Sequence, residues 1–233
     1  MDTPNWLYDE ARHCGVDYGD ASLAAAYDVN HSRLRDYDAE SRRIIAAVGL
    51  KAGETLIDLG CGTGAFAVRA AAHCGRVVGV DVSQAMLDCA AAEARARGIE
   101  NIEFRRGGFL TYVHEGPPAD CIVSTVALHH LPDFWKAVAL KRLFGMLRPG
   151  GRFYLFDVVF SCDAANFEGA VDGWIRSIAE KSGPVLAAEA EVHLREEYST
   201  FAWVMEGLLE RAGFVIESRE FPDAFTAAYV CRK

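Results

Sequence analysis

The chain of 233 residues carries a formal net charge of −9, and 51% of its residues are hydrophobic and 24% charged. This balance is typical of a soluble globular protein and excludes a broad basic face that binds nucleic-acid phosphates. Its seven cysteines are an odd number, with no CxxC pair and no Cys/His cluster at zinc spacing, so we expect reduced thiols, no metal site and a cytoplasmic location.

Residues 1–53 are predicted to form a helical N-terminal cap. They begin without the basic and apolar stretches of a signal peptide, and no apolar run in the chain approaches 18 residues, so we expect neither export nor a membrane span. Residues 24–29 and 33–48 are mostly helix formers, and Gly49 and Gly53 end the second run. The segment is rich in aromatic residues, which favours packing of its helices on the rest of the protein.

From residue 54 onward, short apolar runs alternate with longer helical runs. This alternation predicts parallel strands joined by right-handed helical crossovers, hence an α/β fold for residues 54–233. Residues 161–198 interrupt the pattern with a polar, mixed segment that we interpret as a helical lid insertion. The predicted strands are 55–59, 76–81, 102–105, 120–124, 151–158, 214–218 and 225–230, and the predicted helices are 64–74, 84–97, 133–146 and 199–211.

A strand, a glycine turn and a helix follow one another at residues 55–74. Leu56, Ile57 and Leu59 form the apolar strand, and three glycines then follow at every second position, at 60, 62 and 64. Glycine tolerates a positive φ and lets the backbone approach a ligand closely. The free N–H groups at the following helix N-terminus favour a negative or acceptor-rich group. The turn therefore predicts a nucleotide-like ligand, although an ordinary glycine turn in an α/β protein remains the alternative.

A second strand, residues 77–81, ends in Asp81, 21 residues after Gly60. A carboxylate at this distance from a glycine loop is placed to accept both hydroxyls of a ribose. Together with Asp58, the glycine loop and residues 81–87, this arrangement resembles the class I S-adenosylmethionine (SAM)-dependent methyltransferases of the small-molecule type. The resemblance implies a doubly wound, mostly parallel seven-stranded sheet in the order 3-2-1-4-5-7-6, with its last strand antiparallel and helices on both faces.

The same resemblance implies SAM as the cofactor and S-adenosylhomocysteine (SAH) as the product. Asp58 would hold the amino-acid end of SAM, although a carboxylate satisfied by loop N–H groups remains open, and Met86 would cover the adenine unless it is a core residue. Many family members carry an acid at position 108 that contacts the adenine amino group, whereas this chain has Gly108. The predicted cofactor-binding residues are Asp58, Gly60, Cys61, Gly62, Gly64, Asp81, Val82, Met86, Gly108, Phe109, Thr125 and Val126.

The fourth strand leads into His129-His130-Leu131-Pro132-Asp133. This stretch resembles that of small-molecule and lipid-type methyltransferases, so we expect a small-molecule acceptor and no nucleic acid. Methyl transfer from a sulfonium depends mainly on positioning, and a base is needed only where the acceptor loses a proton. The candidate bases are His130 and Tyr27, followed by His193 and Glu197.

Two other functions stay open on the sequence. A SAM-binding protein that does not methylate, such as a carboxy-SAM type enzyme or a sensor, is the first alternative. An NAD-linked oxidoreductase is the second, because NAD folds share the glycine loop and the strand-end acid. The sequence also leaves open whether the chain forms a homodimer.

Overall fold

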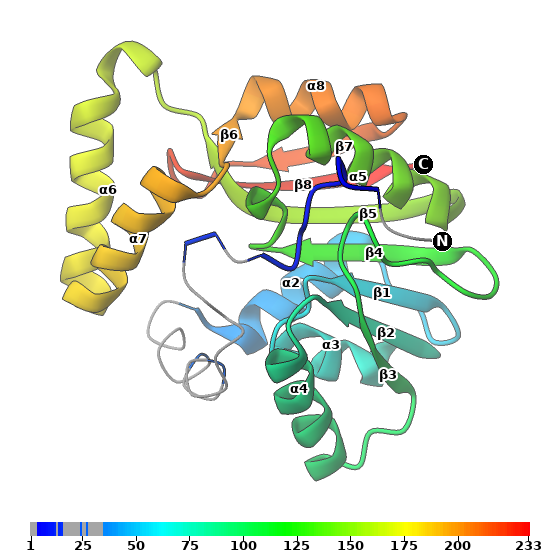
Figure 1. Cartoon of the computed structure of the whole chain (residues 1–233). Helices are drawn as coiled ribbons and strands as arrows, with labels where there is room; N and C mark the ends of the chain where they lie inside the picture. The colour runs from blue at the N-terminus through cyan, green and yellow to red at the C-terminus, as the bar shows by residue number, and fades with distance from the viewer. Residues whose placement is uncertain (1–3, 13, 16–23, 25–26, 28–34) are drawn as a thin grey trace.

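The computed structural model describes residues 4–12, 14, 15, 24, 27 and 35–233. Within these residues, eight strands form one sheet in the order β3-β2-β1-β4-β5-β8-β7, and a short β6 pairs with β5 (Figure 1). The strands are β1 (Thr55–Leu59), β2 (Arg76–Asp81), β3 (Ile102–Arg106), β4 (Ala119–Thr125), β5 (Leu147–Phe160), β6 (Thr200–Phe201), β7 (Val215–Glu220) and β8 (Thr226–Arg232).

The order of the sheet confirms the predicted topology. β1 to β5 pair in parallel, and β8 runs antiparallel to both β5 and β7. The two-residue β6 adds a strand that was not predicted, and it shifts the numbering of the last two strands by one. The strand order reverses between β1 and β4, and ligands of such sheets bind outside the carboxyl ends of the strands at that point.

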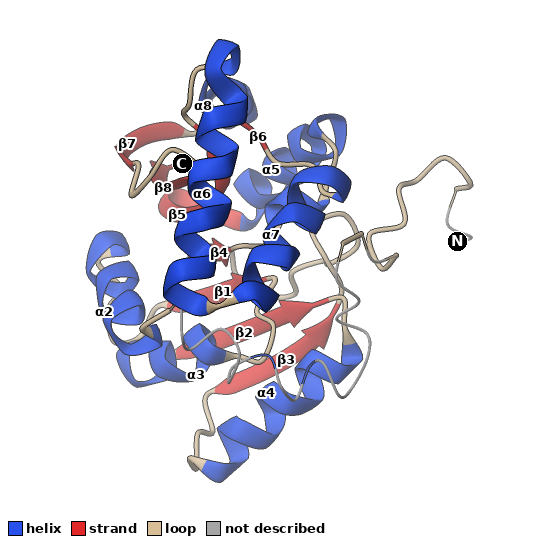
Figure 2. Cartoon of the chain, turned by 90° about the vertical axis from the view of Figure 1, so that its left-hand side faces the viewer, coloured by secondary structure: helices blue, strands red, loops and turns tan. Residues whose placement is uncertain are grey.

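Helices cover both faces of the sheet (Figures 1 and 2). The α-helices are α2 (Tyr37–Val48), α3 (Ala65–Ala70), α4 (Gln84–Ala96), α5 (Asp133–Met146), α6 (Phe167–Ser182), α7 (Pro184–Glu196) and α8 (Ala202–Ala212). Single 3₁₀ turns follow α3 (Ala71–His73) and β4 (Leu128–His130), and another precedes α6 (Ala164–Asn166). No helix among the described residues combines the length and apolarity needed to cross a bilayer.

Alternation along β1 sends its side chains into two hydrophobic cores. Ile57 and Leu59 lie in the core that includes residues of α5 and α8. Leu56 lies in the opposite core, with Ile44 of α2 and Phe66 of α3. The same alternation places Asp58 on the face of Leu56 at the carboxyl end of the strand. α2 and α3 cover that face of the sheet. The carboxyl end of β1 therefore opens between the glycine loop and the N-terminal segment, meaning the described residues that precede α2.

Among the predicted boundaries that differ from the structure, two are explained by strand pairing. The helix predicted from residue 199 begins at Ala202, because Thr200 and Phe201 extend alongside Val159 and Phe160 as β6. The fifth strand begins at Leu147 rather than 151, because Leu147 already pairs with Ala119 before the register shifts.

Of the predicted N-terminal cap and the predicted lid, the cap is only partly described and the lid is described in full. In the predicted cap, α2 packs on α3 and β5, whereas most of the predicted helix 24–29 lies outside the described residues. Residues 161–198 are largely helical, and α6 and α7 run side by side beyond the carboxyl end of β4 (Figures 1 and 2). The cap boundary at 53/54 and the lid role of 161–198 remain predictions.

Candidate functional site

The glycine loop has a backbone that residues with a side chain rarely adopt. Gly60, Gly62 and Gly64 have φ values of 77°, 53° and 77°. A Cβ on Gly60 would lie 2.4 Å from the Cβ of Ala127, and a Cβ on Gly64 would lie 2.9 Å from that of Ala90, whereas one on Gly62 would meet nothing within 4 Å. Gly60 and Gly64 are therefore required for close packing, and Gly62 leaves open space in front of the loop.

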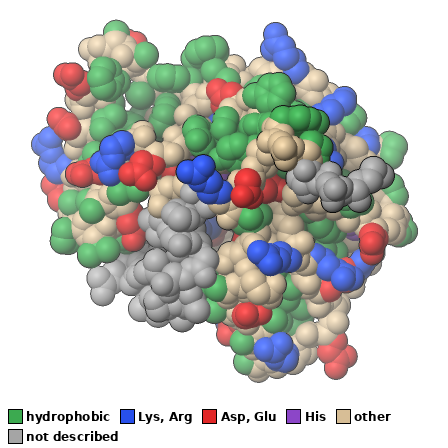
Figure 3. Space-filling view, viewed as in Figure 1, with side chains coloured by type: hydrophobic (Ala, Val, Ile, Leu, Met, Phe, Trp, Pro, Cys, Tyr) green, Lys and Arg blue, Asp and Glu red, His purple; other side chains and the backbone are tan. Residues whose placement is uncertain are grey.

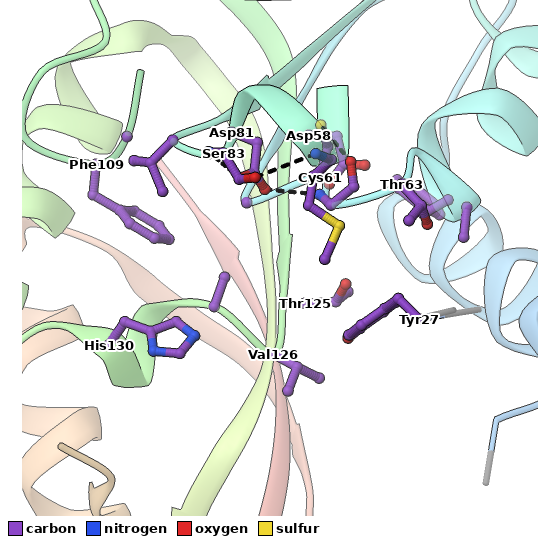
Figure 4. A pocket seen from close by; sticks show the side chains of 18 of the residues that line it. Tyr27, Asp58, Cys61, Thr63, Asp81, Ser83, Phe109, Thr125, Val126 and His130 are labelled. Carbon is purple, nitrogen blue, oxygen red and sulfur yellow. Dashed lines mark hydrogen bonds between the residues drawn. The ribbon is translucent and has the colours of Figure 1, made fainter. Parts of the chain in front are cut away.

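This open space belongs to a cavity of about 370 Å³ at the carboxyl ends of β1, β2 and β4 (Figure 4). Its volume is in the range of roughly 300–1,000 Å³ found for small-molecule sites. Of the predicted cofactor-binding residues, all except Gly64 line it, and so do the first two of the four candidate bases, His130 and Tyr27. Gly64 instead packs on α4.

Asp81 is fixed by the glycine loop. Its Oδ2 accepts the N–H of Gly62 at 2.8 Å, and its Oδ1 accepts the N–H of Ser83 at 2.8 Å (Figure 4). Burial raises the pKa of Asp81, although these N–H groups act to lower it. Each carboxylate oxygen has two lone-pair sites, so both retain capacity for a hydroxyl donor in the cavity.

Asp58 is buried, with 1% of its surface exposed, and neither of its oxygens has a hydrogen-bond partner among the described residues. Burial, and then the negative charge of Asp81, raise the pKa of Asp58 to about 7. A buried carboxylate without a partner is costly, and a cationic ligand in the cavity would remove that cost. The backbone N–H of Ala67 and the charge of Arg35 act to lower the pKa of Asp58, but burial and Asp81 outweigh them. That Asp58 holds the amino-acid end of SAM remains a prediction.

The ends of β2 and β3 supply one wall of the cavity, with Val82, Met86, Gly108 and Phe109. Met86 and Phe109 are buried, with 3% and 7% of their surfaces exposed. Glu10, from the N-terminal segment, lines the same wall. No sequence pattern singled out Glu10. With a glycine at 108 in place of an acid, the sequence had left the contact to the adenine amino group to a backbone group of Gly108 or Phe109, or to a water.

The end of β4 carries a strained backbone. Val126 has φ 53° and is the single non-glycine residue with a positive φ among the described residues. Its N–H donates to the carbonyl of Phe156 at 2.7 Å, which holds it in place. For a β-branched residue this conformation costs on the order of 1–3 kcal/mol, and such strain often occurs at ligand sites. Thr125 and Val126 both line the cavity at this point.

The two adjacent histidines have different environments. His129 is buried, its Nδ1 pairs with Asp157, and its Nε2 lies 3.1 Å from Oε2 of Glu197. Burial opposes the charged form, but the two carboxylates outweigh it and raise the pKa of His129 to about 9. Nδ1 of His193 lies 2.5 Å from the same Oε2 of Glu197. Burial acts to raise the pKa of Glu197, but the two histidines outweigh burial and hold the pKa of Glu197 below its ordinary range.

His130 faces the cavity (Figure 4). Its Nδ1 lies 3.7 Å from Sγ of Cys14 and 4.0 Å from Oε2 of Glu197. Burial, and then the positive charge of His129, lower the pKa of His130 to about 4. His130 is therefore neutral at physiological pH and able to accept a proton. Glu197 and His193 do not line the cavity.

His129, His130 and Glu197 bring one imidazole or carboxylate atom each within 4.8 Å of one another. This spacing would also suit a metal ion. Because Glu197 pairs directly with His129, and Asp157 pairs with its other nitrogen, we interpret the group as an ion-pair network. The sequence prediction that the protein holds no metal remains a prediction.

The fold and the cavity together define a class of protein. The sheet reverses its strand order beside a glycine loop, and a strand-end carboxylate faces the cavity there. This is the arrangement of Rossmann-like enzymes that bind a nucleoside-containing cofactor. Asp58, unpaired in the cavity, adds a site for a cationic group.

Comparison with known proteins identifies the family. A family model of a methyltransferase domain matches residues 56–151. An uncharacterized methyltransferase of Geobacillus kaustophilus is 31% identical over 182 residues, which cover 78% of this chain and 79% of the relative. The 27-O-demethylrifamycin SV methyltransferase of Amycolatopsis mediterranei is 27% identical over 92% of this chain and 82% of its own.

The fold is also found among solved structures. A SAM-dependent methyltransferase from Aquifex aeolicus shares the fold with a TM-score of 0.66 at 18% identity, over 91% of this chain and 98% of that one. The chain belongs to the class I SAM-dependent methyltransferases, as the sequence motifs predicted. Its cofactor is therefore SAM rather than NAD.

The cavity fits this cofactor on the evidence of its own residues. Asp58 offers two unpaired carboxylate oxygens to a cation, and SAM carries an ammonium group as well as a sulfonium. Asp81 offers its remaining acceptor sites to ribose hydroxyls. The space in front of Gly62 leaves room for the ligand beside the loop N–H groups.

Proposed function

We propose that this methyltransferase acts on a small-molecule acceptor and that His130 takes the proton which the acceptor atom loses. The single observation that carries the proposal is the position of His130, a neutral histidine in the wall of the SAM cavity. When bound, SAM supplies a methyl group on an activated sulfonium. The protein has to align the acceptor with that methyl group and exclude water, which can contribute about 7–11 kcal/mol of the barrier.

The residues of the cavity divide into two groups in this proposal. Asp58 would hold the ammonium group of SAM, and Asp81 would hold the ribose hydroxyls. Val82, Met86, Gly108 and Phe109 would enclose the adenine, while Gly60, Cys61, Gly62, Thr125 and Val126 would contact the rest of the cofactor. His130 and Tyr27 lie across the cavity from the two acids (Figure 4), where an acceptor would enter.

Glu197 acts to raise the pKa of His130. Its Oε2 lies 4.0 Å from Nδ1 of His130, and a negative charge at that distance stabilises the imidazolium, although burial and the positive charge of His129 outweigh this effect. Tyr27 is the second candidate for the base.

Residues 161–198 would act as the lid of this site. They deliver Glu197 to the two histidines, and the next N–H, that of Tyr198, donates to the carbonyl of His129 at 3.0 Å. Lys136 also pairs with the carbonyl of Tyr198. The lid is thereby attached next to His130, where it would exclude water from the acceptor.

Charge and relatives favour a small molecule over a nucleic acid. The net charge is −9, and Figure 3 shows basic and acidic side chains interspersed on one face of the molecule. The name of the Amycolatopsis relative gives 27-O-demethylrifamycin SV, a compound rather than a macromolecule, as its substrate.

The test measures SAH formation with a panel of small-molecule acceptors for the wild type and for His130→Asn. We expect the substitution to lower turnover by about 10²- to 10⁴-fold, the usual contribution of a base, while calorimetry shows SAH binding within about twofold of wild type. His73→Asn is the matched control, because His73 is exposed and does not line the cavity.

Unchanged turnover in His130→Asn would remove this residue from proton transfer, and Tyr27→Phe would then be examined in the same assay. Loss of SAH binding together with turnover would instead assign His130 to the cofactor.

A further inference from the structure

The structure shows what fills the space beside Gly108. A Cβ on Gly108 would lie 2.5 Å from both Cδ and Oε2 of Glu10 and 2.8 Å from Oε1. All three distances are below 3.0 Å, which a Cβ atom essentially never shows to another heavy atom. The carboxylate of Glu10 therefore occupies the position in which a side chain of residue 108 would stand.

Glu10 is fixed there by residues that follow Gly108. Its Oε1 accepts the N–H of Thr111 at 2.8 Å and the hydroxyl of Thr111 at 2.6 Å, and it lies 3.1 Å from the N–H of Leu110. Its Oε2 accepts the N–H of Leu110 at 3.0 Å. Four contacts to a loop about 100 residues away in the sequence determine where this carboxylate lies.

The carboxylate also lies in the cofactor cavity. Glu10 lines it together with Phe109, Val82 and Met86, on the side where β2 and β3 end. Oε1 is occupied by three donors, whereas Oε2 has one, so a lone pair of Oε2 remains for a donor in the cavity. A carboxylate accepts hydrogen bonds and donates none, and the partner that it selects must carry an N–H or O–H group.

We infer that Glu10 accepts a hydrogen bond from the exocyclic amino group of the adenine of SAM. Ribose and adenine are adjacent in the cofactor, and the ribose carboxylate, Asp81, stands at the end of β2. The adenine then extends toward the end of β3, where Glu10 replaces the acid that residue 108 lacks. The N-terminal segment thus contributes a residue that determines which base the enzyme accepts. This inference concerns the cofactor and is independent of the acceptor and of His130.

The test compares two ligands by calorimetry. The first is SAH, and the second is its 6-deamino analogue, in which purine replaces adenine and only the amino group is lost. We expect the wild type to bind SAH roughly 10- to 100-fold more tightly than the analogue, because the analogue covers Oε2 of Glu10 without offering it a donor. Glu10→Ala should bind both ligands with nearly equal affinity.

A reciprocal substitution provides the sharper test. Gly108 does not have a positive φ, so its backbone accepts a side chain. Gly108→Asp alone should weaken SAH binding at least tenfold, because two carboxylates would occupy one space. In Glu10→Ala/Gly108→Asp the space is free for the new aspartate, and the preference for SAH over the analogue should return.

The ratio of the two affinities is measured on the same variant, so it does not depend on what fraction of the protein is folded. Glu115→Ala, which removes an exposed carboxylate outside the cavity, is the matched control and should keep the wild-type ratio. A wild-type ratio in Glu10→Ala would overturn the inference. So would a double variant that binds SAH no more selectively than Glu10→Ala.

Discussion

Protonation of Asp58 should make cofactor binding depend on pH. The carboxylate is buried, has no hydrogen-bond partner among the described residues, and has a pKa of about 7. Only its ionised form attracts the ammonium group of SAH. With a pKa of 7, about one tenth of the groups are ionised at pH 6 and about nine tenths at pH 8.

The affinity for SAH should therefore fall about tenfold from pH 8 to pH 6, which corresponds to about 1.4 kcal/mol. The direction of this pH dependence follows from the charge of the ligand. A bound ammonium group lowers the pKa of Asp58, so that SAH binding below pH 7 releases a proton. Titration calorimetry at pH 6, 7 and 8, repeated in two buffers of different ionisation enthalpy, measures both the affinity and the number of protons released.

Asp58→Asn is the matched variant, because it keeps the shape of the side chain and removes the titration. It should bind SAH more weakly at pH 8, with an affinity that changes little between pH 6 and 8. A flat wild-type profile, or an identical slope in Asp58→Asn, would refute the assignment of the ammonium site to Asp58.

Two further predictions concern the other strand ends. Asp81→Ala should weaken SAH binding by about 1–3 kcal/mol, since it removes the acceptor of the ribose hydroxyls, and an unchanged dissociation constant in calorimetry would exclude Asp81 from the site. In the folded protein the pKa of His129 is raised to about 9. The ion pairs of His129 therefore contribute fully to the free energy of unfolding below pH 6.5, and this contribution, on the order of 3 kcal/mol, is lost as the pH rises to 9. Urea denaturation at pH 6 and pH 9 should show this loss in the wild type and a smaller one in Asp157→Asn, and equal losses in both proteins would contradict the proposed ion pair.

Glu10, which lines the cavity, and Glu197, which lies behind His130 outside it, have one feature in common. Each is a carboxylate brought by a segment outside the strand–helix alternation, and each lies next to a loop at a strand end. The core sheet supplies the acids of β1 and β2, whereas these added segments supply the groups that would read the adenine and support the base.

The sequence by itself determined the fold and the centre of the site, because the signals are local. The run from Leu56 to Gly64 contains an apolar strand, its carboxylate and the glycines that the turn requires, all within one stretch of chain. Asp81 follows at the end of the next strand. Backbone preference and side-chain periodicity were sufficient for the strands, the turn and the position of this acid, whereas the order of the sheet was implied by the resemblance to class I SAM-dependent methyltransferases.

Only the tertiary structure decided how the side chains pair. It showed that Asp58 has no hydrogen-bond partner within the part of the chain that is described. It also showed that Asp157 and Glu197 enclose His129 and that His130 lies in the cavity wall. It also brought Glu10 against Gly108, about 100 residues away. Such contacts join segments that are distant in the sequence. The distances between the groups and their burial set each pKa and determine which lone pairs stay free, and both arise only when the chain is packed.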